Sequence, residues 1–152
     1  DPGWRWQGHA YLDSNRGSVP LADSFASWQW ARATLDTQRS AVAYDALQPD
    51  GTARHIALQF DSQGGCQPVA APPMQALPPG AVFRVARSQR SDAGQPPRVL
   101  ATLEDTPFYN RSLVAAHWCG QPVVAMHESL DLARFGQPVV QAMLPFRMPR
   151  RG

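Results

Sequence analysis

The stretch AVAYDALQPDGTARHIALQF, residues 41–60, contains the clearest β-hairpin in the sequence and points to an antiparallel β-fold. Pro49, Asp50 and Gly51 supply turn chemistry between two runs of alternating side chains. Alternation with a two-residue period is typical of a strand, whose successive side chains point to opposite faces. The second run places Ile56, Leu58 and Phe60 on one face and His55, Gln59 and Asp61 on the other. The sequence therefore predicts two antiparallel strands joined by a tight turn.

Similar alternating runs, broken by turn residues about every ten positions, recur along the chain and favour an antiparallel all-β barrel or sandwich. Further strands are expected at residues 4–13, 26–34, 82–89, 97–104, 111–118, 122–128 and 138–147. With the two hairpin arms these give about eight or nine strands, and a barrel of about that size can enclose one ligand.

Three stretches interrupt the strand pattern. Residues 62–81 are too rich in Pro and Gly for a sheet interior, and we expect a long surface loop of the kind that covers a barrel mouth. Residues 90–97 are expected to form a shorter turn region. The segment 128–136 is expected to form a single helical turn closed by Gly136.

Length and composition predict one globular domain. A chain of 152 residues is long enough for a single hydrophobic core and too short for two. The 14 Arg residues, with no Lys, face 12 acidic residues spread along the chain, so there is no basic stripe for nucleic acid. Cys66 and Cys119 lie far apart and are predicted to be ordinary thiols.

The sequence contains no apolar run of the roughly 20 residues that a membrane-spanning helix needs, so a soluble or peripheral protein is expected. Because the chain begins at Asp1 and not at Met, we also expect that residues upstream were removed or left out.

The run WQGHAYLDSNRG, residues 6–17, carries one polar and titratable strand face. That face consists of Gln7, His9, Tyr11 and Asp13. If it lines a pocket, Tyr11 and Asp13 are placed for acid chemistry. If it faces water, Asp13 only caps the turn that follows, and His9 is a solvent-facing side chain and not a base.

Five stretches together resemble one known family. They are AYLDSNRGSVPL at 10–21, WQWAR at 28–32, LEDTPFYNRSLV at 103–114, HESLDLARF at 127–135 and MLPFRMPR at 143–150. In order and spacing they are similar to the carotenoid 1,2-hydratases, also called hydroxyneurosporene synthases. The resemblance implies a lipocalin-like antiparallel β-barrel that is the C-terminal part of a longer two-domain protein.

The resemblance also implies an activity. Members of this family add water, without a cofactor, across the terminal C1=C2 double bond of acyclic carotenoids such as lycopene or neurosporene. It points to Tyr11 and Asp13 as the catalytic pair, with the remaining acid and base residues upstream of Asp1. The implied partners are the carotenoid, water and the upstream domain of the same protein.

Hydration of an unactivated alkene begins with protonation at carbon, so the enzyme needs a carboxylic acid that keeps its proton. At pH 7 only about one solvated Asp in a thousand is protonated, and raising its pKa to neutrality costs about 4 kcal/mol. Burial in an apolar barrel shifts a carboxyl pKa in that direction, which makes Asp13 the expected proton donor and Tyr11 its hydrogen-bonding assistant.

The tertiary cation left at C1 is stabilised by aromatic faces. Trp28 and Trp30 share one strand face and are predicted to line the carotenoid slot, and Trp4 and Trp6, which share a face of their own predicted strand, are the alternative pair. Large aromatics also fill ordinary barrel cores. Glu128 is a second acid candidate. Its alternative role is an ion pair with Arg134 or Arg147.

Other features of the sequence indicate less. His55, His117 and His127 lie in separate predicted strands without ligand spacing, so neither a metal site nor an organic cofactor is expected. The basic end RMPRR, residues 147–151, is expected to be a solvated tail, with a weak contact to anionic lipid as the alternative. The expected location is cytoplasmic or peripheral to the bacterial inner membrane. Two rival functions stay open: a non-catalytic lipid or carotenoid binding module, and a scaffold for a catalytic partner domain.

Overall fold

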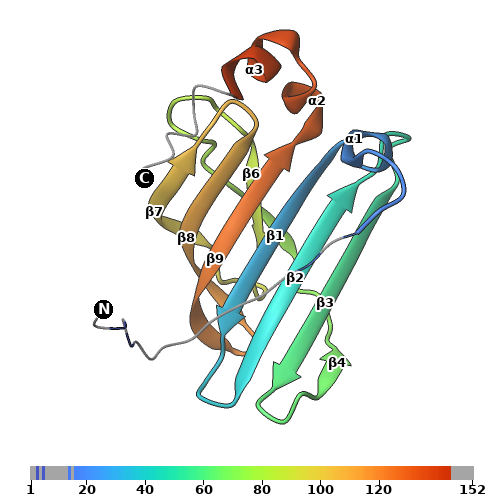
Figure 1. Cartoon of the computed structure of the whole chain (residues 1–152). Coiled ribbons are helices and arrows are strands. Elements are labelled where there is room, and N and C mark those ends of the chain that lie inside the picture. Colours follow the sequence, from blue (N-terminus) through green and yellow to red (C-terminus); the bar gives the residue numbers. More distant parts are fainter. Residues whose placement is uncertain (1–2, 4, 6–13, 15, 145–152) are drawn as a thin grey trace.

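The structure is a computed structural model that describes residues 3, 5, 14 and 16–144 (Figure 1). In this part of the chain the strands are β1 (Ser27–Thr34), β2 (Arg39–Leu47), β3 (Ala53–Asp61), β4 (Cys66–Pro68), β5 (Met74–Leu77), β6 (Arg87–Arg90), β7 (Arg98–Asp105), β8 (Tyr109–Trp118) and β9 (Gln121–Asp131). The helices are short: α1 (Leu21–Ser24), α2 (Leu132–Phe135) and α3 (Pro138–Met143). The predicted dominance of antiparallel β-structure is confirmed.

Seven strands form one sheet in the order β4, β3, β2, β1, β9, β8, β7, and every neighbouring pair is antiparallel. β5 and β6 form a separate two-stranded sheet that lies behind the large one in Figure 1. Within the described residues no pairing joins the outer strands β4 and β7, so the expected barrel closure is not found there. β4 is a poor template for a further strand, because it is short and ends in Pro68, which has no N–H to donate.

The hairpin predicted at residues 41–60 is confirmed. β2 and β3 pair in continuous register from Arg39 opposite Asp61 to Leu47 opposite Ala53. At the turn Gly51 adopts a φ of 85°, which glycine reaches without steric cost. The Asp50 carboxylate accepts a hydrogen bond of 2.8 Å from the Thr52 N–H, so the turn residues act as their types predict.

The strands expected at 26–34, 97–104, 111–118 and 122–128 are confirmed as β1, β7, β8 and β9. β9 continues to Asp131, whose side chain accepts a hydrogen bond from the Arg134 N–H and so caps α2. The predicted helical turn therefore exists, with Gly136 directly after it, but it begins later than residue 128.

Other predicted elements were wrong. Residues 138–147 were expected as a strand, but α3 occupies 138–143, where Pro138 suits the first turn of a helix. The expected loop 62–81 contains β4 and β5, because pairing with β3 and β6 outweighs a Pro-rich composition. The strand expected at 82–89 forms only from Arg87 onward, since Arg84 has a φ of 57° and interrupts extended backbone. The strand expected at 4–13 lies outside the described residues.

The two faces of the large sheet differ in side-chain size. The face toward β5 and β6 carries a buried cluster made largely of alanine: Ala31, Ala33, Ala41, Ala43, Ala116, Trp118, Val123 and Ala125. Small side chains let β6 approach closely, and β6 contacts β1, β8 and β9. Arg90 of β6 also binds both carboxylate oxygens of Asp45 on β2, at 2.6–3.0 Å. The larger side chains of β1 to β3 therefore point to the opposite face, which we call the open face.

The cysteines are as expected. Cys66 and Cys119 are both free and exposed, as predicted for ordinary thiols. Among the helices of the described segments, none has the length and apolar character needed to cross a membrane.

Candidate functional site

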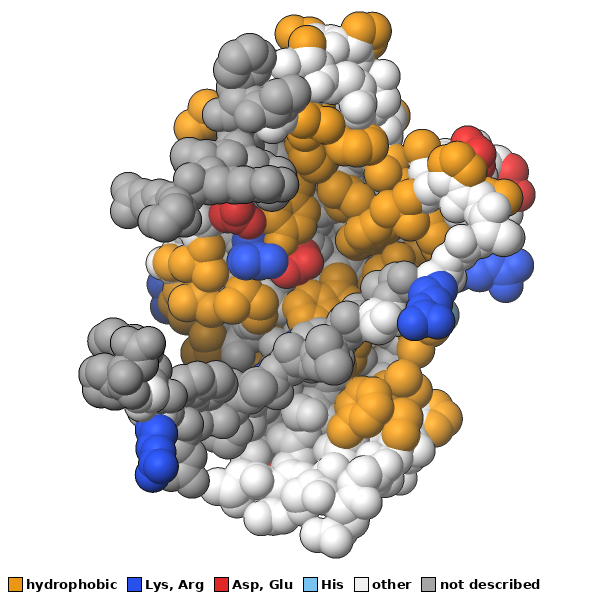
Figure 2. Space-filling view, in the orientation of Figure 1, with side chains coloured by type: hydrophobic (Ala, Val, Ile, Leu, Met, Phe, Trp, Pro, Cys, Tyr) orange, Lys and Arg blue, Asp and Glu red, His pale blue; other side chains and the backbone are white. Residues whose placement is uncertain are grey.

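The open face carries an apolar hollow with a volume of about 970 Å³. The strand residues that line it are Trp28 and Trp30 on β1, Val42 and Tyr44 on β2, Ile56, Leu58 and Phe60 on β3, and Glu128 on β9. Leu21 of α1, residues of the segment before that helix, and Phe25 directly after it form a wall. Figure 2 shows hydrophobic side chains gathered over this face. A volume of this size is at the upper end of the range for small-molecule sites.

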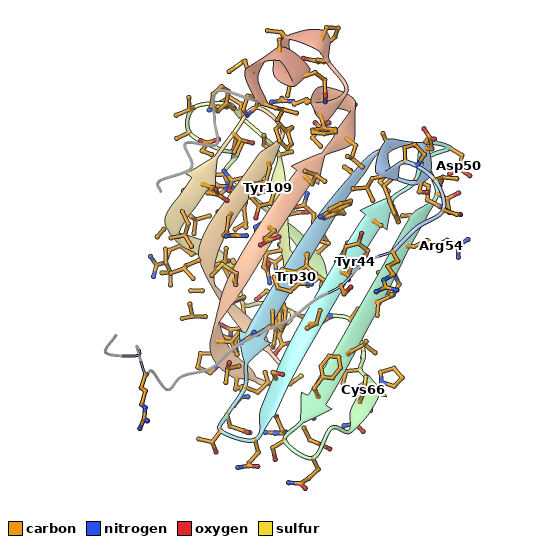
Figure 3. All side chains as sticks on the ribbon, viewed as in Figure 1. Trp30, Tyr44, Asp50, Arg54, Cys66 and Tyr109 are labelled. Atoms are coloured by element: carbon orange, nitrogen blue, oxygen red, sulfur yellow. The ribbon has the colours of Figure 1, made fainter. Side chains whose placement is uncertain are left out.

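Aromatic rings line the hollow in contact with one another. The ring centroids of Phe25 and Trp28 are 5.9 Å apart in an edge-on arrangement, and those of Trp28 and Tyr44 are 6.1 Å apart with a 46° tilt. Trp30 and Tyr44 pair across β1 and β2 and are labelled in Figure 3. Such pairs hold the rings in fixed positions, so the wall is preformed.

One row of residues crosses six strands of the open face, because each member lies directly opposite the next in the strand pairing. The row is Ile56, Tyr44, Trp30, Glu128, Arg111 and Glu104, on β3, β2, β1, β9, β8 and β7. Its first three members are apolar or aromatic, and its last three are charged. The apolar half of the face thus meets the charged half between Trp30 and Glu128.

A second hollow of about 380 Å³ lies beside the first. Leu113, Val124 and Met126 supply apolar lining, and Arg32, Thr34 and Arg111 supply polar lining. Trp30 and Glu128 line both hollows. Among the described residues, Glu128 is therefore the carboxylate that lines both hollows.

Glu128 belongs to a hydrogen-bonded cluster with Arg111 and Tyr109. The Arg111 Nε–H donates to Glu128 Oε1 at 3.0 Å and to the Tyr109 hydroxyl oxygen at 2.9 Å. The guanidinium carbon also lies 5.7 Å from the centre of the Tyr109 ring. Burial, followed by the charge and hydrogen bond of Glu128, raises the pKa of the Tyr109 hydroxyl. Tyr109 therefore stays protonated and serves as a donor, while Arg111 balances the Glu128 charge.

The structure places some of the predicted site residues at this site. Trp28 and Trp30 lie together in the hollow and outside the alanine-rich core. The ion pair expected between Glu128 and Arg134 was wrong: Glu128 pairs with Arg111, while Arg134 lies 3.4 Å from Asp131. Glu128 and Arg111 are opposite in register, whereas the sequence shows only proximity along the chain. Arg147, Tyr11 and Asp13 lie outside the described residues.

Sequence reasoning missed Tyr109 and Arg111. Both lie in the stretch FYNRS, where the strand period places them on one face. That alternation was the available signal, but it does not show that Glu128 is opposite.

His127 is unsuited to act at this site. His127 is fully buried on the other face of β9, with its Nε2 2.9 Å from the Ser88 carbonyl oxygen. Burial lowers its pKa to about 4, so the ring is neutral at pH 7. Among the described residues no three His, Cys, Asp or Glu side chains group closely enough to hold a metal ion.

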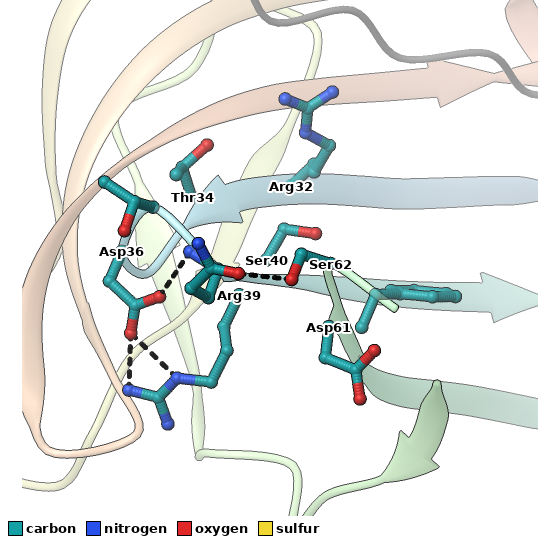
Figure 4. Close-up of a pocket in the computed structure, with 10 residues that line it drawn as sticks. Arg32, Thr34, Asp36, Arg39, Ser40, Asp61 and Ser62 are labelled. Carbon is teal, nitrogen blue, oxygen red and sulfur yellow. Dashed lines mark hydrogen bonds and ion pairs between the residues drawn. The ribbon is translucent and has the colours of Figure 1, made fainter. Parts of the chain in front are cut away.

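A different hollow of about 210 Å³ lies at the turn between β1 and β2 (Figure 4). Its polar side chains pair with each other: Asp36 accepts from Arg39 at 2.8 Å, and the Ser62 hydroxyl donates to Gln38. The Asp36 pKa is lowered by a hydrogen bond from the Gln38 N–H and by Arg39. These groups are exposed, so the hollow is an ordinary hairpin end and not the candidate site.

Comparison with known proteins gives consistent matches along the whole sequence. The family described as "Carotenoid hydratase CrtC" matches residues 1–152. An acyclic carotenoid 1,2-hydratase of Thiocapsa roseopersicina is 47% identical over 151 residues, covering 99% of this chain and 37% of that protein. The enzyme of the same name from Rubrivivax gelatinosus is 45% identical over 150 residues with the same coverage. That from Rhodobacter capsulatus is 39% identical over 150 residues and is covered to 53%.

The chain thus spans between 37% and 53% of the length of these relatives. Among solved structures, a protein of Nitrosomonas europaea described as an AttH superimposes with a TM-score of 0.53 at 17% identity. The match covers 75% of this chain and 41% of that one, and it concerns the fold alone.

Proposed function

The chain belongs to the carotenoid hydratase CrtC family, and from that premise we propose that the protein containing it hydrates acyclic carotenoids such as lycopene or neurosporene. In this proposal the protein is a hydro-lyase that adds water across the terminal C1=C2 bond and leaves a tertiary alcohol at C1. The observation that carries the proposal is the aromatic hollow of the open face, which meets a carboxylate at Trp30 and Glu128.

The hollow suits the end of an acyclic carotenoid. Its strand walls are mainly apolar, so a hydrocarbon gains about 25 cal/mol for each Å² of surface removed from water. Trp28 and Trp30 present ring faces, each worth about 0.5–2 kcal/mol to a nearby cation. A cation at C1 is the charge that forms during acid-catalysed hydration. We assign Trp28 and Trp30 to substrate binding on this basis.

Asp13 is our proposed proton donor, and Tyr11 is its proposed hydrogen-bonding partner. Protonation at C2 leaves the cation at C1, and water then adds to C1 and loses one proton. Hydration changes the oxidation state of neither water nor protein, so we propose that it proceeds without a cofactor. Asp13 fits the role if apolar surroundings keep its carboxyl group neutral.

We also propose that the longer protein completes a lipocalin-like barrel around this site. Apart from the β1–β9 pairing, neighbours in the large sheet are neighbours in the sequence, as in up-and-down barrels. The remaining length of the relatives supplies the proposed upstream domain. Because acyclic carotenoids partition into lipid, we place the protein in the cytoplasm or at the bacterial inner membrane.

The test is hydration of lycopene in detergent by the full-length protein, with the product identified by a mass gain of one water molecule. We expect turnover in the wild type and a loss of at least 100-fold in Asp13→Asn. A wild-type protein that binds lycopene without forming product would overturn the proposal in favour of a binding module. Full turnover in a folded Asp13→Asn variant would overturn the role of Asp13.

A further inference from the structure

We propose that Glu128 is the base that removes a proton from the water molecule attacking C1. This inference rests on the proposed hydratase function and adds a catalytic residue to it. The observation behind it is the position of an ion-paired carboxylate at the border of two hollows, the larger of which is mainly apolar.

The position of Glu128 brings a polar group to the place where the cation is stabilised. Its neighbour across the strand pairing is Trp30, whose ring lines both hollows. A cation held against that ring lies on the same face as the carboxylate. Besides its apolar residues the smaller hollow is lined by Arg32, Thr34 and Arg111, and Glu128 is the one carboxylate in that lining, so a water molecule there can donate a hydrogen bond to Glu128.

The hydrogen bonds of Glu128 leave it able to act as an acceptor. Arg111 binds Oε1 at 3.0 Å, and a carboxylate has about four acceptor positions on its two oxygens. The side chain is 25% exposed, which allows the proton it accepts to pass on to solvent. Arg111 holds the carboxylate in place and Tyr109, which stays protonated, cannot compete for the proton.

The step balances in atoms and charge. The acid delivers a proton to C2, and the C1=C2 electron pair forms the new C–H bond. A water oxygen then donates a lone pair to C1 and forms the C–O bond. The resulting oxonium group loses its proton to Glu128, which gives the tertiary alcohol. Glu128 then releases that proton to solvent, while the acid regains one, so the net change is the addition of one water molecule.

Glu104 offers a matched control. Its carboxylate lies 3.9 Å from the same Arg111, but its side chain is 48% exposed and lines neither hollow. Glu104→Gln and Glu128→Gln therefore remove the same charge from the same guanidinium. Only Glu128→Gln removes a carboxylate from the lining of the hollows.

The experiment follows lycopene hydration by the full-length protein in D₂O, with product and recovered substrate analysed by mass spectrometry. We expect Glu128→Gln to lower kcat about 100-fold or more, while lycopene still quenches tryptophan fluorescence at the wild-type concentration. Protonation at C2 continues in this variant, so the cation returns to alkene. The ratio of deuterated recovered lycopene to hydrated product is then expected to rise at least tenfold above that of the wild type. Glu104→Gln should stay within threefold of wild type in both measures.

Several results would overturn the inference. One is a Glu128→Gln variant with kcat within threefold of wild type. Another is a folded Glu128→Gln variant that loses deuterium incorporation together with product, because this would place Glu128 at the protonation step. Glu128→Asp keeps a carboxylate on a shorter side chain and must be faster than Glu128→Gln. A wild-type protein that neither hydrates lycopene nor incorporates deuterium would instead overturn the proposed function itself.

Discussion

Trp30 and Glu128 lie directly opposite each other where β1 pairs with β9, so an aromatic ring and a carboxylate are neighbours on the open face. β1 supplies the ring at the edge of the apolar half, and β9 supplies the charge at the edge of the polar half. A reaction that forms a cation and then consumes water needs both kinds of group close together. The predictions below separate their contributions from the stability of the fold.

Replacement of Trp30 by Leu in the full-length protein is expected to lower kcat for lycopene about tenfold, because the proposed contact between its ring and the developing cation is lost. Trp30→Phe keeps an aromatic face and should retain most of the rate. Steady-state kinetics on both variants measure the difference. Equal losses in the two variants would show that ring electrostatics at this position do not matter.

A charge at Ile56 is expected to weaken carotenoid binding at least tenfold, because the Ile56 side chain lines the apolar hollow. Ile56→Asp should leave the fold intact, since Ile56 is 52% exposed. Val139 on α3 is 63% exposed, does not line the hollow and gives the control Val139→Asp. Titration of tryptophan fluorescence with lycopene measures both. The same affinity in the two variants would place the carotenoid elsewhere.

Loss of the ion pair between β2 and β6 is expected to destabilise the protein. The side chains of Asp45 and Arg90 are 17% and 14% exposed, and Asp45→Ala would leave the guanidinium poorly paired. We expect the free energy of unfolding to fall by about 2–3 kcal/mol, somewhat less than for a fully buried pair. Urea denaturation followed by circular dichroism measures it.

The exposed pair of Asp36 and Arg39 provides the comparison for that experiment. Asp36→Ala should change the urea midpoint little, because solvent screens surface ion pairs. A larger loss of stability in Asp36→Ala than in Asp45→Ala would contradict the view that the Asp45–Arg90 ion pair anchors β6 to the large sheet.

Stability is expected to fall as the pH drops below about 6.5, because His127 is neutral in the folded protein. Burial holds its pKa at about 4, whereas an unfolded chain takes up the proton near pH 6.5. Between these values the unfolded state binds more protons, so acid favours it. Near pH 4 this lowers the free energy of unfolding by about 3 kcal/mol relative to its value above pH 7, where the effect is absent.

The variant His127→Gln isolates this effect. Between pH 6.5 and 4, its urea midpoint should depend less on pH than that of the wild type. The carboxylates contribute equally in both proteins, so the difference reports His127. Parallel pH profiles would show that His127 is accessible to protons in the folded state.

The alternation of side chains was visible in the sequence because it is a local property. Ile56, Leu58 and Phe60 share a face by strand period alone, and all three line the hollow. The turn at Gly51 and the helical turn before Gly136 also follow from local residue types. Residues 138–147 were misassigned for the same reason, since a short apolar run suits either a strand or a helix.

By itself the sequence determined which side chains share a strand face, where the chain turns at Gly51, and which family the motifs resemble. Only the tertiary structure decided what each face meets. β6 covers the alanine face because small side chains allow its close approach, which leaves the aromatic face as a hollow. The pairing of β8 with β9 likewise brings Arg111 to Glu128, although 17 residues separate them in the chain. Local periodicity fixes orientation within a strand, whereas partners across strands depend on register between distant segments.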